Sequence, residues 1–177
     1  SVGASVKLVD DDGDGDLDVL FDGNVGRYEN NGSGVFTPSG SGLSADYIAT
    51  TDSNQGGQLY IITADLSANT ITLDAGGTTA SVPLNAPRNL TAADLDGDGF
   101  TDVIATSDTD GDLFWYNNHR TTGNFFQGNP FKKTIYSGLT GAYDVTVGDL
   151  DADGDLDLLA SGRSGSGTIA WYENGGE

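Results

Sequence analysis

One nine-residue window occurs three times in this 177-residue chain, and it restricts the possible folds more than any other feature. The copies read DDDGDGDLD at residues 10–18, DLDGDGFTD at 94–102 and DLDADGDLD at 149–157. Each copy is followed by two apolar residues and, further on, by a segment that contains Tyr and ends in Asn (RYEN, WYNN and WYEN). Self-similarity of this kind indicates a structural repeat.

The spacing of the windows gives the length of the repeat. The first two begin 84 residues apart, which is twice 42, and a weaker copy, DSNQGGQLY, is found at the expected midpoint, residues 52–60. The last two begin 55 residues apart, so about 13 residues are inserted there, around 119–131. We therefore predict one domain, 1–177, made of four repeats at about 1–42, 43–84, 85–139 and 140–177.

The segments between the windows are typical of strands. Runs rich in β-branched and aromatic residues alternate with Gly, Asp and Asn, and no stretch keeps a helical period. Four short antiparallel strands in about 42 residues is the size of a propeller blade. The predicted fold is all-β, a propeller-type array of four four-stranded blades. The last blade lacks its outer strand, because its repeat ends at Glu177.

The window has the composition of a cation-binding loop. Calcium takes six to eight oxygen ligands at about 2.3–2.6 Å, and a tight turn with Gly at position 6 can point alternate carboxylates inward. Carboxylates at positions 1, 3, 5 and 9 repel one another unless a cation lies between them. Position 7 supplies a backbone carbonyl, so its side chain can vary. The predicted calcium ligands, at three sites, are Asp10, Asp12, Asp14, Asp16 and Asp18; Asp94, Asp96, Asp98, Phe100 and Asp102; and Asp149, Asp151, Asp153, Asp155 and Asp157.

Two other calcium motifs fail on spacing. An EF-hand needs an acidic residue at position 12 and flanking helices, whereas position 12 here is Phe21, Ala105 or Ala160. Toxin-type β-roll repeats recur every nine residues rather than every 42. In the weaker copy Gly56 and Tyr60 replace the acids at positions 5 and 9, so we expect no ion there. Since the repeat tolerates that loss, we expect calcium to brace the fold rather than to contact a ligand.

Composition supports these predictions. The chain has 24 Asp but only 3 Glu, and 15 of the Asp lie in the three windows. A net charge of −20 argues against nucleic acid and anionic membranes as partners. The chain has no Cys, and no apolar run is long enough to span a membrane. A start at Ser1, without Met or a signal peptide, fits a processed secreted protein or a fragment.

The run DLDADGDLDLLA at residues 149–160, with WYEN at 171–174, resembles the FG-GAP/VCBS-type repeats, which are similar to the calcium-binding blades of integrin α-subunit propellers. The resemblance covers all four repeats and is strong in three. It implies a propeller-type fold with calcium between the first two strands of a blade, and a role in adhesion or recognition. The chain departs from the family in blade count, since closed members commonly have seven.

A ligand surface is less well defined. Three Phe residues in the inserted segment, Phe125, Phe126 and Phe131, form either an interface with a protein or glycan partner or a contact with the blade's own edge. His119 is the only His and has no supporting motif, so we predict no enzyme activity. Asn31 and Asn89 begin N-glycosylation sequons.

We therefore expect a non-catalytic, secreted or cell-surface module for adhesion or recognition, stabilised by calcium. Two alternatives stay open. One is a structural subunit that forms homo-oligomers or filaments through its open last blade, and the other is an accessory domain of a secreted enzyme.

Overall fold

The computed structural model describes residues 6–21, 26–39, 47–52, 59–75, 78–118 and 131–176. Within these residues every regular element is a strand, which confirms the all-β prediction. The strands are β1 (Val6–Val9), β2 (Asp18–Phe21), β3 (Gly26–Asn30), β4 (Phe36–Pro38), β5 (Tyr47–Asp52), β6 (Leu59–Asp65), β7 (Thr70–Ala75), β8 (Thr78–Pro83), β9 (Pro87–Ala93), β10 (Asp102–Ser107), β11 (Asp112–Asn117), β12 (Phe131–Ser137), β13 (Ala142–Gly148), β14 (Asp157–Gly162) and β15 (Thr168–Tyr172).

The strands form four antiparallel sheets, each a simple meander in chain order. Sheet 1 holds β1–β4, sheet 2 holds β5–β8, sheet 3 holds β9–β12 and sheet 4 holds β13–β15. The last sheet thus has three strands where the others have four, as the sequence predicts. Since β15 pairs only with β14 among the described strands, its outer edge is open.

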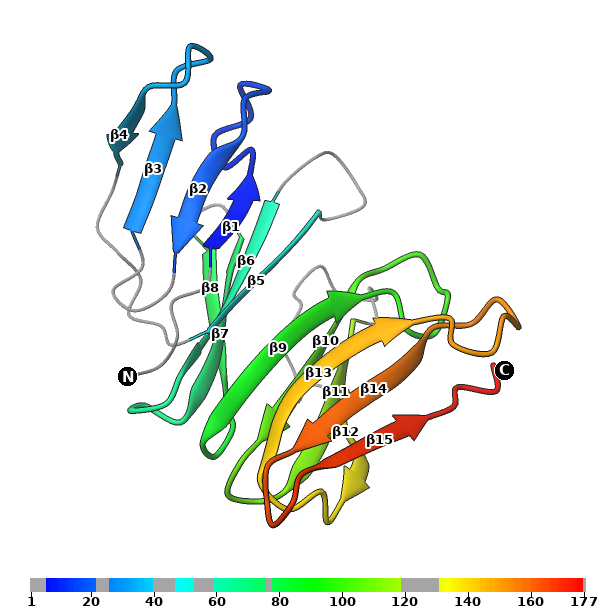
Figure 1. Ribbon diagram of the computed structural model, residues 1–177. Helices are drawn as coiled ribbons and strands as arrows, with labels where there is room; N and C mark the ends of the chain where they lie inside the picture. Colours follow the sequence, from blue (N-terminus) through cyan, green and yellow to red (C-terminus); the bar gives the residue numbers. More distant parts are fainter. Residues whose placement is uncertain are drawn as a thin grey trace.

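The sheets follow one another as the blades of a propeller do. The first strands of successive sheets contact each other, β1 with β5, β5 with β9 and β9 with β13. Sheet 1 lies at one end of the array and sheet 4 at the other, with sheets 2 and 3 between them (Figure 1). The described residues form an open array rather than a closed ring.

The core lies in the joints between sheets, because alternate strand residues point to opposite faces. One apolar cluster joins sheets 2 and 3 and includes Ile62, Ile71, Val103 and Tyr116. A second joins sheets 3 and 4 and includes Ile104, Leu113, Val145 and Leu158. Sheet 3 is therefore covered on both faces, and all six residues of β10 are buried.

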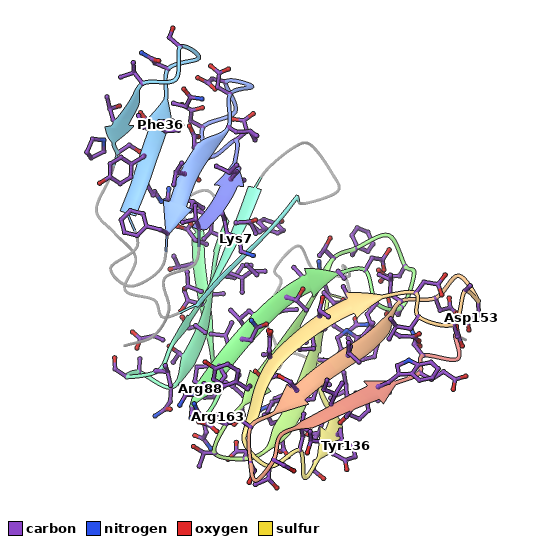
Figure 2. The ribbon with its side chains drawn as sticks, in the orientation of Figure 1. Lys7, Phe36, Arg88, Tyr136, Asp153 and Arg163 are labelled. Atoms are coloured by element: carbon purple, nitrogen blue, oxygen red, sulfur yellow. The ribbon has the colours of Figure 1, made fainter. Side chains whose placement is uncertain are left out.

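Polar contacts supplement two of the joints. Arg27 of sheet 1 forms an ion pair with Asp74 of sheet 2, with 3.4 Å between guanidinium and carboxylate. At the joint of sheets 3 and 4, Arg88 and Arg163 both reach Asp108, at 2.7 and 3.0 Å (Figure 2). These groups are partly exposed, so each pair contributes at most about 1 kcal/mol to stability.

Candidate metal centres

The three complete windows occupy the same place in their sheets, the connection between the first and second strands. They link β1 to β2, β9 to β10 and β13 to β14. Asp153, at position 5 of the last window, lies at the tip of such a loop (Figure 2). The weaker window falls between β5 and β6, but its residues 53–58, with Gly56, lie outside the described residues. Tyr60, in the place of the position-9 Asp, instead packs beside the first apolar cluster.

Backbone N–H groups hold the carboxylates of each loop in the same pattern. The N–H of position 6 donates to the carboxylate of position 1, position 5 donates to position 3, and position 7 donates to position 5. These bonds are Gly15 to Asp10 at 3.0 Å, Gly99 to Asp94 at 2.9 Å and Gly154 to Asp149 at 3.1 Å; Asp14 to Asp12, Asp98 to Asp96 and Asp153 to Asp151 at 3.1–3.3 Å; and Asp16 to Asp14, Phe100 to Asp98 and Asp155 to Asp153 at 2.8–3.0 Å. The repeat is thus one of geometry as well as of sequence.

The turns require a left-handed backbone at positions 4 and 6. Gly takes this conformation at five of the six positions, for example Gly97 at φ 71° and Gly99 at φ 87°. The sixth is Ala152, at position 4 of the last loop, with φ 66°. A residue with a Cβ is strained in this region, so Ala152 makes the last loop less favourable than the others.

Each loop gathers carboxylates closely enough to share one cation. Three carboxylate oxygens lie within 4.8 Å of one another in each of the groups Asp10, Asp12 and Asp18; Asp94, Asp96 and Asp98; and Asp149, Asp151 and Asp157. The donors are all oxygen, which suits a hard cation such as calcium rather than zinc or copper. The residues present therefore fit the predicted ion. Full coordination, including the carbonyls of Asp16, Phe100 and Asp155, stays a prediction.

The Asp at position 9 has a second role, which the sequence analysis missed. Asp18, Asp102 and Asp157 are buried at 2% exposure or less. In each, one carboxylate oxygen accepts a hydrogen bond from the backbone N–H of position 2, and the other accepts one from the backbone N–H of an Asn at the end of the sheet's third strand or just after it. The position-2 bonds come from Asp11, Leu95 and Leu150, and the others come from Asn30, Asn118 and Asn174.

The same Asn residues close the loop from the other side. Each side-chain amide donates to the carbonyl of position 8, which is Leu17, Thr101 or Leu156. Asn174 also donates to the carbonyl of Leu95 in the neighbouring loop, at 2.8 Å. We call this reciprocal Asp and Asn pair the clamp. The signal was in the sequence, because RYEN, WYNN and WYEN share their final Asn.

The clamps differ in their electrostatics. Burial raises the pKa of Asp102 to about 6, against the partial opposition of hydrogen bonds from Asn118, Trp115 and Leu95. In contrast, the hydrogen bond from the Asn174 N–H lowers the pKa of Asp157, outweighing a smaller effect of burial. The pKa of Asp151 is raised, by burial first and by neighbouring carboxylates. Both raised pKa values thus come first from burial, and the neighbouring carboxylates add to them.

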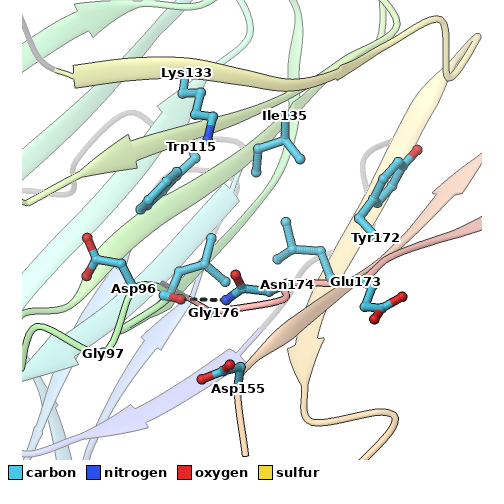
Figure 3. A pocket seen from close by; sticks show the side chains of 12 residues that line it. Asp96, Gly97, Trp115, Lys133, Ile135, Asp155, Tyr172, Glu173, Asn174 and Gly176 are labelled. Atoms are coloured by element: carbon cyan, nitrogen blue, oxygen red, sulfur yellow. Dashed lines mark hydrogen bonds between the residues drawn. The ribbon is translucent and has the colours of Figure 1, made fainter. Parts of the chain in front are cut away.

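A pocket of about 680 Å³ lies between sheets 3 and 4, beside two of the loops. Trp115, Lys133 and Ile135 line it from sheet 3, and Tyr172 and Glu173 line it from the end of sheet 4 (Figure 3). The Lys133 ammonium lies 5.4 Å from the centre of the Trp115 ring. Asp96 and Asp155, from two different loops, complete its acidic side.

The predicted Phe interface is not described. Phe125, Phe126 and His119 lie outside the described residues, and Phe131 begins β12 with its side chain outside them. The interface stays a prediction. Among the described residues, no helix is long and apolar enough to cross a membrane.

The comparisons with known proteins agree with the repeat fold. Residues 94–160, which contain the third-sheet and fourth-sheet loops, match the family model of the FG-GAP-like repeat. No curated protein matches the chain. Among solved structures the chain is similar to the Tc holotoxin pore of Photorhabdus luminescens, with a TM-score of 0.51 and 19% identity over 94% of this chain. The chain spans 9% of the length of that protein, so the likeness concerns the fold alone.

Proposed function

We propose that the protein is a non-catalytic, extracellular recognition or adhesion module whose blades are braced by calcium, and the match of residues 94–160 to the FG-GAP-like repeat supports this proposal. The observation that carries the proposal is the threefold recurrence of one carboxylate arrangement at one place in the sheet. A set of solvated turn residues would have no reason to repeat both the spacing and the hydrogen bonds.

In this proposal calcium stabilises the hairpin formed by the first two strands of sheets 1, 3 and 4. The cation neutralises carboxylates that are held together by backbone N–H groups, and position 9 links the site to the clamp and so to the aromatic strand. Binding to the folded state alone raises the free energy of unfolding. With dissociation constants of roughly 10⁻⁴–10⁻³ M, typical of extracellular modules, about 10 mM calcium would add about 1.4–2.7 kcal/mol per occupied site.

The test compares thermal unfolding in metal-free buffer, in calcium and in magnesium. We expect calcium to raise the melting temperature by many degrees and magnesium to do so weakly, because magnesium demands a stricter octahedral shell. Isothermal titration should give three sites. A melting temperature that calcium leaves unchanged would refute the proposal.

A matched set of variants distinguishes the loss of a metal ligand from a change in the net charge of the protein. Replacing the position-3 acids, as in Asp12→Asn, Asp96→Asn and Asp151→Asn together, keeps an oxygen that can accept the turn hydrogen bond but removes a charged ligand from each loop. The calcium response should largely disappear. Asp144→Asn removes an exposed charge from β13, outside the loops, and should leave the response unchanged.

The pocket between sheets 3 and 4 is the described surface best suited to recognition. An aromatic ring, an ammonium and carboxylates around a cavity of about 680 Å³ suit a polar ligand such as a glycan. Glycan-array binding, with Glu173→Gln and Lys133→Ala as pocket variants, tests this role. Binding that both variants leave intact would place recognition elsewhere on the molecule.

A further inference from the structure

Each sheet has two faces that can be followed from repeat to repeat. The preceding face points toward the sheet before it in the chain, and the following face points toward the next. In sheet 3 the preceding face carries Leu90, Val103 and Tyr116, which belong to the cluster shared with sheet 2. Its following face carries Leu95, Ile104, Leu113 and Trp115, which pack in the cluster shared with sheet 4.

Strand register shows that sheet 4 is built in the same way. Val103 pairs with Tyr116 in sheet 3, and Leu158 pairs with Tyr172 in sheet 4. Ile104 pairs with Trp115, and Leu159 pairs with Trp171. The preceding face of sheet 4, with Val145, Leu158 and Tyr172, packs against sheet 3 as this equivalence requires.

The following face of sheet 4 has the same residue types, but no other sheet of the described residues packs on it. Leu113 is fully buried, whereas its equivalent Ile169 is 77% exposed. Leu95 is buried, and its equivalent Leu150 is 50% exposed. Trp171, the equivalent of Trp115, is also 50% exposed. Side chains that form a core in one repeat thus face solvent in the next.

Sheet 1 carries the complementary face at the other end of the array. Val19 pairs with Tyr28, as Val103 pairs with Tyr116, so both point toward a preceding sheet. On β1, Val6 and Leu8 hold the places of Leu90 and Ala92, which pack against sheet 2 in the inner joint. Val6 and Leu8 are each 62% exposed. The described chain therefore has the two halves of one joint, at opposite ends.

We propose that the following face of sheet 4 in one copy of this chain docks on the preceding face of sheet 1 in a second copy. The occupant is a second copy because this chain supplies both halves, and each half has the residue positions that pack in the joints on either side of sheet 3. Pairing of sheet 4 with itself would set Trp171 against Trp171, a contact with no counterpart in the array. The association is heterologous, so it leads to rings or to filaments.

Charge sets the conditions under which the copies associate. Each carries a net charge of −20, which opposes association at low ionic strength. Salt shortens the range of this repulsion, so the association should strengthen as salt is added. The proposal does not depend on calcium binding, although bound calcium would also lower the repulsion.

The test measures mass by sedimentation velocity from micromolar to millimolar protein at two salt concentrations. We expect the mean mass to rise with protein and with salt. Two variants block one end each: Ile169→Lys with Trp171→Lys on sheet 4, and Val6→Lys with Leu8→Lys on sheet 1. All four residues are exposed, so the fold should survive, which circular dichroism and thermal unfolding would verify.

A mixture of the two blocked variants tests whether sheet 4 of one copy docks on sheet 1 of another. Each variant alone should be monomeric, and an equimolar mixture should form dimers and nothing larger, because only one productive pair of faces remains. Val35→Lys, which adds the same charge at an exposed apolar residue outside both faces, should associate like the unmodified chain. A monomeric unmodified chain at every concentration would overturn the proposal. So would dimers of the sheet 1 variant alone, because they would show that sheet 4 pairs with itself.

Discussion

Sheets 3 and 4 have the same loop, the same clamp and the same strand register, yet they differ in how much protein surrounds them. Sheet 3 has a neighbour on each face, and the carboxylate of Asp102 is buried deeply enough to raise its pKa to about 6. Sheet 4 has one neighbour among the described sheets, and the pKa of the equivalent Asp157 is lowered by the hydrogen bond from the Asn174 N–H. The local sequence sets the geometry of the site, and the neighbouring sheets set its electrostatics.

This difference distinguishes two contributions to the stability of a repeat protein, the hydrogen bonds within one repeat and the burial of apolar surface between repeats. The clamp and the turn bonds are made within one repeat, so they recur unchanged in sheets 1, 3 and 4. Burial of a sheet face depends on the next repeat, so apolar residues that are buried in sheet 3 have exposed equivalents on sheet 4, such as Ile169 and Leu150. Repeat proteins are stabilised by just these two terms, the single repeat and its joint with the neighbour.

The largest expected effect comes from the joint. Ile104→Ala removes a fully buried side chain between sheets 3 and 4 and should cost about 2–5 kcal/mol of unfolding free energy. Leu159→Ala, at the equivalent and partly exposed position, should cost about 1 kcal/mol or less. Urea unfolding at low protein concentration measures both. Equal costs would mean that sheet 4 is covered in solution even at that concentration.

The pH dependence of stability should distinguish the two clamps. The pKa of Asp102 is about 6 in the folded chain against an ordinary 3.8, so burial of its charged form destabilises the fold, and most fully above pH 6. As pH falls from 7 to 5 in metal-free buffer, folded Asp102 takes up a proton and the melting temperature should rise. Asp157, with its pKa lowered, stabilises the fold at these pH values and loses that contribution only below about pH 4, so it should not contribute to this rise.

A matched pair of variants tests whether Asp102 causes this change of melting temperature with pH. Asp102→Asn should reduce the rise in melting temperature between pH 7 and 5, whereas Asp157→Asn should leave it in place. With saturating calcium the slope should reverse in the unmodified chain, because protons then compete with the cation for the same oxygens. A slope that Asp102→Asn does not change would show that other carboxylates cause it.

The Asn of the clamp should have a smaller effect. Asn118→Ala and Asn174→Ala each keep the backbone N–H that binds the position-9 Asp but remove the amide that binds the position-8 carbonyl. Each should cost about 1 kcal/mol. Asn174→Ala should cost more than Asn118→Ala, because it also removes the bond to the Leu95 carbonyl of sheet 3. Chemical denaturation of the two variants in parallel checks the order.

The sequence predicts much of this molecule because its main information is periodic. The threefold window predicted where the loops lie, the 42-residue spacing predicted the number of sheets, and the missing segment after WYEN predicted the three-stranded last sheet. The ligand roles of the fifteen window residues stay a prediction. The geometry groups position 9 with positions 1 and 3 in two loops but position 5 with them in the third.

What the sequence could not predict depends on three-dimensional context. Trp115 and Trp171 occupy the same repeat position, so no pattern could show that one lies in a joint and the other faces solvent. Asp102 and Asp157 likewise hold the same window position and are both buried, yet the pKa of Asp102 is raised to about 6, chiefly by burial, and the pKa of Asp157 is lowered, chiefly by the Asn174 N–H. The clamp was visible as a recurring Asn, but its partner is an Asp some 12–17 residues away along the chain, which only the fold brings close.

The smallest expected effect concerns position 4 of the loops. The two variants exchange the residue at this position between the loops of sheets 3 and 4. Ala152 has φ 66°, where Gly97 has φ 71°, and an added Cβ at Gly97 would meet no atom within 4 Å. The only cost of Ala is therefore the backbone conformation, so Ala152→Gly should stabilise the chain by about 0.4–1 kcal/mol and Gly97→Ala should destabilise it by a similar amount. Unfolding in metal-free buffer and in calcium measures both. If calcium selects the turn conformation, the difference should persist in the bound state, because the ion needs the same backbone. Changes of the same sign in both variants would show that the two loops do not share one turn geometry in solution.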